Sequence, residues 1–154
     1  MIASKLKKAG LKFKWYIVGG GSDDAYRMLE NLIDVNMVKD EVILLGVKKN
    51  PYPFIRFADL LVVTSRYESY PTVINEAKVL GLSVLTSDFN GVHEIVDDAD
   101  DWVCPVEMMA DLLIKKISSG EIVRQHRNNN DFLRHNHEII KTFERILGDV
   151  VPTT

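Results

Sequence analysis

The chain has 154 residues and a single cysteine, Cys104. One thiol cannot close a disulfide within the chain, which excludes the class of small disulfide-stabilised domains and favours a reducing compartment. The chain also lacks an apolar run of about 18 residues, the length that a membrane-spanning helix needs. Its first residues lack the pattern of a secretory signal peptide. These absences predict one soluble domain over residues 1–150, followed by a loose tail at 151–154.

A strong excess of either charge is absent as well. Lysine and arginine total 19 and aspartate and glutamate total 22, which gives a formal net charge of −3. Without a dominant basic field, the chain is not expected to bind nucleic acid. A basic cluster near the N-terminus is either a solvated helix face or a contact with a membrane surface; it consists of Lys5, Lys7, Lys8, Lys12 and Lys14.

Short apolar segments alternate with amphipathic ones along the chain, without an internal repeat. This alternation predicts an α/β, Rossmann-like three-layer domain in which helices cover a mostly parallel sheet. The helix expected at 23–36 has Ala25, Met28, Leu29 and Leu32 on one face. The predicted strands are 13–18, 42–45, 60–63, 83–86 and 102–104. The predicted helices are 2–9, 23–36, 51–57, 71–80, 106–118 and 131–147.

The segment from Arg66 to Ala77 carries the clearest functional signal. It follows a strand-like run and holds two carboxylates, Glu68 and Glu76, on either side of Pro71. Proline is favoured at the first position of a helix, because its fixed φ suits the helix and its missing N–H would have no partner there. A helix beginning at Pro71 would expose the next amides together with the positive end of its dipole, which makes a phosphate site.

The two carboxylates indicate what surrounds that phosphate site. A carboxylate accepts hydrogen bonds, is repelled by phosphate, and binds a diol through strong charge-assisted bonds. Carboxylates on both sides of a phosphate site therefore predict a ligand with hydroxyls at both ends of a diphosphate: a sugar at one end and a ribose at the other.

This segment resembles the signature region of GT-B-fold glycosyltransferases of family 4, also called glycosyl transferases group 1. That signature has a Glu, seven residues, a second Glu and a small residue, then a Gly-x-x-Val strand and a Gly-x-x-Glu turn. The resemblance covers residues 11 to about 118 and implies the C-terminal, donor-binding domain. The matching residues are Glu68, Glu76, Ala77, Gly81-Leu82-Ser83-Val84-Leu85 and Gly91-Val92-His93-Glu94-Ile95-Val96. Upstream, Tyr16 to Gly21, Val42 to Gly46, and Ala58-Asp59-Leu60 with Ser65 match earlier strands in order.

The resemblance implies a role for each matched residue. Glu68, as the catalytic residue, would hold the hydroxyls of the donor sugar, and Glu76 would hold the ribose. The diphosphate would contact the backbone of Ser69, Tyr70, Pro71, Thr72 and Val73. Gly19 and Gly20 form either a tight turn alone or a turn lining the nucleotide cleft, and Gly46 with Lys48 would approach the base. The donor is a nucleotide diphosphate sugar, and neither a resident cofactor nor a metal is implied.

The implied reaction is transfer of a hexosyl group, with retention, to a hydroxyl of a sugar or lipid-linked acceptor. Its expected setting is synthesis of cell-surface polysaccharide or lipopolysaccharide, in the cytoplasm or at the inner face of the cell membrane. The family's opening strand, its Gly-Arg-like turn, its downstream lysine and its N-terminal acceptor domain have no counterpart here, so the chain resembles a domain truncated at its N-terminus. Two alternatives stay open: a non-catalytic nucleotide-binding or assembly fragment, and a GT-B nucleotide-sugar epimerase.

Three other groups of residues are interpreted structurally. The aspartates are expected to form an acidic surface turn rather than a metal site, although clustered oxygens suit hard cations. The three histidines nearest the C-terminus, of four in the chain, do not have zinc-site spacing, because two of them are two residues apart and diverge on a helix. Cys104 is expected to be a small core residue rather than a nucleophile. The aspartates are Asp97, Asp98, Asp100 and Asp101, and the histidines are His126, His135 and His137.

Overall fold

A computed structural model describes residues 1–68, 71–96 and 101–122 of the chain. The helix expected at 131–147, the tail at 151–154 and the three histidines lie outside these ranges, as do Ser69 and Tyr70. Among the helices that are described, none combines the length and the hydropathy needed to cross a membrane.

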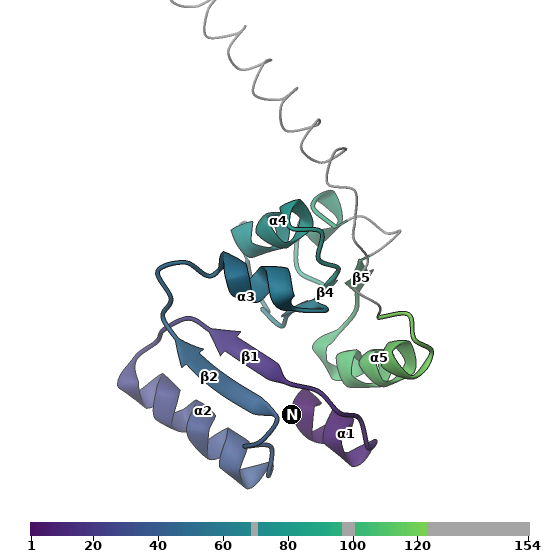
Figure 1. Ribbon diagram of the computed structural model, residues 1–154. Helices are drawn as coiled ribbons and strands as arrows, with labels where there is room; N and C mark the ends of the chain where they lie inside the picture. The colour runs from purple at the N-terminus through teal and green to yellow at the C-terminus, as the bar shows by residue number, and fades with distance from the viewer. Residues whose placement is uncertain (69–70, 97–100, 123–154) are drawn as a thin grey trace, which may run out of the picture.

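Helices and strands alternate in the order that the sequence predicts (Figure 1). The boundaries agree to within two residues, and α5 matches the expected range at both ends. The helices are α1 (Ile2–Lys8), α2 (Asp23–Val35), α3 (Tyr52–Phe57), α4 (Thr72–Val79) and α5 (Val106–Ser118), with a 3-10 turn, η1 (Val92–Glu94). The strands are β1 (Trp15–Val18), β2 (Val42–Gly46), β3 (Leu61–Val63), β4 (Val84–Thr86) and β5 (Trp102–Val103).

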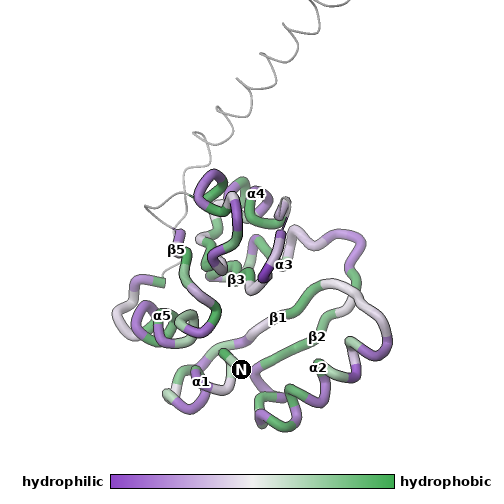
Figure 2. The backbone as a smooth tube through the Cα atoms, turned by 180° about the vertical axis from the view of Figure 1, so that it is seen from behind, coloured by the Kyte–Doolittle hydropathy of each residue, from purple (hydrophilic) through white to green (hydrophobic). Residues whose placement is uncertain are grey.

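All described strand pairs are parallel, which confirms the predicted α/β class. The strands form two sheets rather than the single sheet that the alternation predicts: β1 pairs with β2, and β3-β4-β5 form a separate sheet. Helices α1 and α2 lie on the side of β1 and β2 that faces away from α3 and α4 (Figure 1). Figure 2 shows that β2 is hydrophobic along its length, whereas α2 alternates between hydrophobic and hydrophilic residues.

One apolar cluster joins the two sheets. Its buried members are Leu6 of α1, Leu85 of β4 and Met109 and Leu113 of α5. Partly buried side chains from both sheets pack on this cluster, among them Trp15 of β1 and Val62 of β3. The helix pair α1 and α5 therefore provides apolar contact between strands that share no hydrogen bonds.

The apolar face of α2 differs from the prediction. Leu29 and Ile33 pack in the core with Val38 and Val42. Met28 and Leu32, which were expected on the same buried face, are 67% and 40% exposed. The helix has two adjacent apolar stripes, and hydrophobic periodicity alone does not distinguish the one that faces the core.

Helix α4 is fixed to the second sheet by a buried ion pair. Lys78 Nζ lies 3.4 Å from Asp101 Oδ2, and the Asp101 side chain has no exposed surface. The other oxygen, Asp101 Oδ1, accepts a 2.9 Å hydrogen bond from the backbone N–H of Val84, the first residue of β4. The prediction of an acidic surface turn is thus wrong for Asp101, because its carboxylate satisfies a buried lysine and a strand amide. Asp97, Asp98 and Asp100 lie outside the described residues.

Replacing Asp101 with alanine should destabilise the domain strongly. The change leaves the Lys78 ammonium and the Val84 N–H without this buried partner, which costs about 3–5 kcal/mol when a buried pair is broken. Urea denaturation followed by circular dichroism measures the loss in the free energy of unfolding. Asp111→Ala, at an exposed position of α5, is the matched control and should change that free energy by less than about 0.5 kcal/mol. If both variants lost the same small amount of unfolding free energy, the buried Lys78–Asp101 pair would not be what fixes α4 to the sheet.

Candidate functional site

The residues predicted to bind a ligand follow the carboxyl ends of parallel strands. Gly19 and Gly20 follow β1, Gly46 ends β2 and Glu68 follows β3. Asn90, which was not predicted as a site residue, follows β4. In α/β folds this edge of the sheet is where ligands bind, because the loops that leave parallel strands meet there.

The glycines after β1 and β2 contact each other closely. The N–H of Gly19 donates a 3.0 Å hydrogen bond to the carbonyl of Gly46. Gly19 and Gly46 have φ values of 145° and 68°, backbone conformations that residues other than glycine rarely adopt. A Cβ on Gly20 would lie 2.7 Å from Cγ2 of Val47. Gly19 and Gly46 are therefore required by the turn itself, whether or not a ligand lies beside it, whereas a side chain at Gly20 would have to displace only the exposed side chain of Val47.

Lys48 extends from this turn toward α3. Its ammonium lies 6.0 Å from the ring centroid of Phe54, at the outer limit of a cation–π contact. The side chain is exposed, so this contact is weak enough for an anionic or aromatic ligand to displace it.

Glu68 is held by a hydroxyl that the sequence did not assign to the site. Ser65 Oγ donates a 2.6 Å hydrogen bond to Glu68 Oε1. The buried Ser87 after β4 in turn donates from its Oγ to the carbonyl of Ser65, and its N–H donates a 2.9 Å bond to the carbonyl of Val63. The loop that carries Glu68 is therefore tied to β4. The sequence signal that could have predicted this bond is a serine within two residues of the end of each of two neighbouring strands, Ser65 after β3 and Ser87 after β4.

A hollow of about 310 Å³ lies beside Glu68. Its lining residues are Arg66, Tyr67, Glu68 and Asn90, and we call it the Glu68 hollow. It combines a carboxylate, a guanidinium, an amide and the ring of Tyr67, whose exposed fraction is 92%. This set can accept hydroxyl hydrogen bonds, donate to an anion and stack on the face of a sugar. Arg66 is its cation and was not predicted as a site residue.

Helix α4 presents an open N-terminus near this loop. The helix begins at Thr72, and Pro71 precedes it at the N-cap with φ −76° and ψ 89°. The prediction that Pro71 is the first helical residue is thus wrong by one position, because its ψ is not helical. The N-cap residue Pro71 makes no side-chain hydrogen bond to this end, so within the described residues the amides of Thr72 and Val73 are open together with the positive end of the dipole. Ser69 and Tyr70, predicted beside them, lie outside the described residues.

Glu76 occupies a different position from Glu68. It is half-buried within α4, and it is not among the residues that line the Glu68 hollow. Within the described ranges, no side chain forms a hydrogen bond or ion pair with its carboxylate. The structure thus brings Gly19, Gly20 and Gly46 together and groups Glu68 with Ser65 and Asn90, whereas Glu76 is not among the described residues that line the Glu68 hollow.

Comparison with known proteins identifies the family. The model of the glycosyl transferases group 1 family matches residues 2–131. The chain belongs to this family. The N-acetyl-alpha-D-glucosaminyl L-malate synthase of Bacillus anthracis is 25% identical over 149 residues, which cover 90% of the chain and 38% of the synthase.

Solved structures share the fold of this group 1 domain. Anabaena Alr3699/HepE, in complex with UDP and glucose, aligns with a TM-score of 0.74 at 19% identity, covering 94% of the chain and 44% of that protein. The apo form of the lipopolysaccharide outer core galactosyltransferase WaaB aligns with a TM-score of 0.63 at 20% identity, covering 81% of the chain and 38% of WaaB. The expected GT-B fold is confirmed, and the chain spans less than half the length of each of these proteins.

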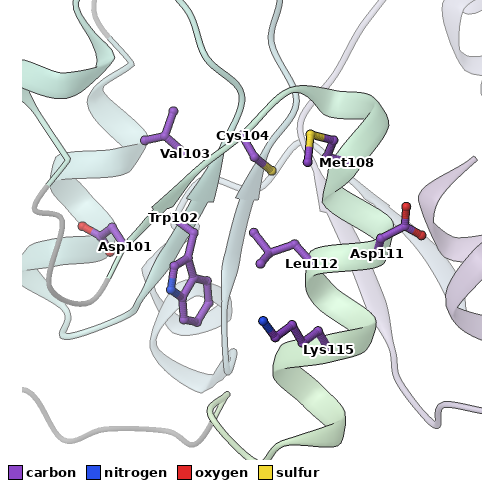
Figure 3. A pocket seen from close by; sticks show the side chains of 8 residues that line it. All are labelled: Asp101, Trp102, Val103, Cys104, Met108, Asp111, Leu112 and Lys115. Atoms are coloured by element: carbon purple, nitrogen blue, oxygen red, sulfur yellow. The ribbon is translucent and has the colours of Figure 1, made fainter.

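The group 1 domain has a second, larger cavity away from the predicted site. This cavity of about 580 Å³ lies between β5 and α5, with Trp102, Cys104, Leu112 and Lys115 among its lining (Figure 3). Burial raises the pKa of the Cys104 thiol above its ordinary value of 9.0. The thiol is therefore protonated at neutral pH, which agrees with a packing role and not with that of a nucleophile.

The reactivity of Cys104 with iodoacetamide should rise steeply with pH. Because only the thiolate reacts and the pKa lies above 9.0, the rate should increase about tenfold per unit between pH 7 and 9 without reaching a plateau. Mass spectrometry of the alkylated chain measures the rate, and the same chain unfolded in urea is the control, with a plateau at lower pH. A rate that levels off near pH 7 in the folded chain would show an activated thiol.

Proposed function

We propose that this chain is the donor-binding part of a retaining glycosyltransferase that transfers a hexosyl group from a nucleotide diphosphate sugar to a hydroxyl acceptor. The observation that carries this proposal is the combination of an open helix end and a pre-oriented carboxylate on one strand-to-helix loop. Pro71 to Val73 supply the amides, and Glu68, held by Ser65, supplies the carboxylate.

The diphosphate is proposed to lie at the start of α4. The amides of Thr72 and Val73 would donate to its oxygens, together with backbone at Ser69 and Tyr70. Charge that builds on the leaving diphosphate would be stabilised there, which is electrostatic catalysis rather than proton transfer. Arg66 in the Glu68 hollow supports this assignment, since it provides a guanidinium close to the expected position of the sugar phosphate bond.

The hexose is proposed to occupy the Glu68 hollow. Because Ser65 donates to Oε1, the carboxylate has a fixed orientation and Oε2 can accept from sugar hydroxyls. A pre-oriented acceptor loses little entropy when the ligand binds, so its hydrogen bonds contribute more to affinity and specificity. The Asn90 amide, which also lines the hollow, would add a donor and an acceptor for a further hydroxyl.

The nucleoside is proposed to extend toward β1 and β2. Glu76 would accept from the ribose hydroxyls, and the Gly19-Gly20 turn would let the nucleoside approach the backbone closely. Gly46 and Lys48 would contact the base. The 3.0 Å bond between Gly19 and Gly46 supports this assignment, because it brings the two glycine turns into one surface.

The biological setting is proposed from the relatives. The similarity to a lipopolysaccharide outer core galactosyltransferase supports a role in cell-surface polysaccharide or lipopolysaccharide synthesis, with a sugar or lipid-linked acceptor. Such a reaction would take place in the cytoplasm, at the inner face of the membrane. Because the chain spans only part of the length of its relatives, we propose that a further domain supplies the acceptor-binding site and a catalytic base. Nucleotide binding without transfer is the alternative for this chain alone.

Isothermal titration with UDP and with UDP-glucose tests the proposed orientation. Glu76→Gln replaces the charged acceptor for the ribose by a neutral amide and should weaken both ligands about tenfold, the difference that a charge-assisted hydrogen bond makes. Glu68→Gln should weaken UDP-glucose by a similar factor while leaving UDP unchanged, because only the sugar contacts it.

Glu107→Gln, an exposed position on α5, is the matched control and should bind both ligands as the unmodified chain does. The orientation would be contradicted if Glu68→Gln weakened UDP as much as UDP-glucose, or if Glu76→Gln bound both ligands normally. If UDP binds in the proposed way but incubation with UDP-glucose yields neither transfer nor a changed sugar, the non-catalytic alternative is correct for this chain. A changed sugar in the absence of an acceptor would indicate an epimerase.

A further inference from the structure

The cavity between β5 and α5 is an apolar groove that the described residues leave open. The β5 segment contributes Trp102 and Cys104, and α5 contributes Met108 and Leu112. Figure 3 shows Leu112 and Lys115 pointing from α5 toward Trp102. Met108 is 59% exposed, and the whole hollow has a volume of about 580 Å³. Apolar side chains gathered in a hollow of this size are typical of a surface that another group covers.

Strand β5 is also an edge strand in the part of the chain that the structure describes. It pairs with β4 alone, and the N–H of Cys104, directly after it, donates a 3.1 Å hydrogen bond to the carbonyl of Thr86 on β4. Native proteins commonly cover such an edge with a helix or a loop, because an open edge pairs with other chains. The apolar groove and the open strand therefore call for the same kind of cover.

The chain itself contains an element that fits the groove. Residues 69–70, 97–100 and 123–154 lie outside the described ranges. The first two stretches read Ser-Tyr and Asp-Asp-Ala-Asp, which are too short and too polar for an apolar groove. The third stretch includes the helix that the sequence predicts at 131–147. Its apolar residues Phe132, Ile139, Phe143 and Ile146 are spaced by seven, four and three residues, so they lie on one side of a helix.

The position of Ile122 brings this segment within reach of the groove. Ile122 is the last described residue, and it packs on the same cluster as Trp102, Cys104 and Leu112. Residues 123–130 can span up to about 27 Å when extended, which exceeds the length of about 20 Å of α5. A short tether raises the effective concentration of the segment into the millimolar range. The segment therefore reaches the groove more readily than a second copy of the chain does.

We propose that residues 131–147 form a helix whose apolar stripe docks into the groove between β5 and α5 of the same chain. The stripe covers Met108 and completes the burial of Trp102 and Leu112, which the cluster that joins the two sheets leaves half-buried. Lys141, on the opposite side of this helix, stays in water. The docked helix thus extends the cluster that holds the two sheets together to the C-terminal segment.

Disulfide trapping in the full 154-residue chain tests the contact directly, because Cys104 is its only thiol. Ile139→Cys, Phe143→Cys and Ile146→Cys each place a second thiol on the stripe. At least one of them should form a disulfide with Cys104 in a glutathione redox buffer, since the Cα atoms must approach within about 7 Å. Lys141→Cys is the matched control and should stay unpaired. Mass spectrometry and a non-reducing gel distinguish a disulfide within the chain from one between two copies.

Alkylation of Cys104 measures the cover without a cross-link. Phe143→Glu places a charge in the apolar contact and should raise the rate with iodoacetamide at pH 8 about fivefold or more, because the thiol loses its cover. Lys141→Glu should react as the unmodified chain does. A Phe143→Glu rate equal to that of the urea-unfolded chain would show unfolding instead, and the trapping result then decides.

Three results would overturn the proposal. The first is that no stripe variant pairs with Cys104, or that Lys141→Cys pairs equally well. The second is that Phe143→Glu alkylates at the rate of the unmodified chain. The third is that the disulfides join two copies, which would assign the groove to a second copy of the chain.

Discussion

The buried pair between Lys78 and Asp101 is the interaction on which the site depends most. It links the last turn of α4 to the strand pair β4 and β5, because one Asp101 oxygen contacts Lys78 and the other accepts from the first amide of β4. Helix α4 carries both Glu76 and the open amides at Thr72 and Val73. A helix end can bind an anion only if the helix cannot withdraw from the ligand. The proposed binding of an anion at the start of α4 therefore depends on this buried contact, because the contact holds α4 against the sheet.

A second constraint is the pairing of loops after neighbouring parallel strands. Ser87 leaves β4 and bonds to the carbonyl of Ser65, and Ser65 leaves β3 and bonds to Glu68. This relay converts the fixed spacing of two strands into a fixed orientation of one carboxylate. The glycine turns after β1 and β2 are likewise joined to each other, by a backbone hydrogen bond from Gly19 to Gly46. The described residues form these two groups on separate sheets, joined through the cluster around Leu6, Leu85 and Met109.

Local signals in the sequence predicted most of the fold. The alternation of short apolar runs with amphipathic segments identified every described strand and helix, and α5 was predicted at both ends because its stripe is regular. The glycine turns and the loop that carries Glu68 were predicted as site candidates, and the structure places each of them after a strand. What could not be predicted depends on tertiary contacts. Asp101 belongs to an acidic run in the sequence, and only the approach of Lys78 makes it an anchor. The Ser65–Glu68 bond and the hollow with Arg66 depend on loop conformation, and the choice between two stripes of α2 depends on where β2 lies.

The central claim is that the strand-end surface from the glycine turns to the Glu68 hollow binds a nucleotide diphosphate sugar. Amide chemical-shift mapping of the ¹⁵N-labelled chain during addition of UDP-glucose tests it most directly. The account predicts that the largest changes fall on Gly19, Gly46, Glu68 and Thr72 and on their immediate neighbours. Changes centred instead on Trp102 and Cys104, in the cavity between β5 and α5, or no change at saturating ligand, would contradict it.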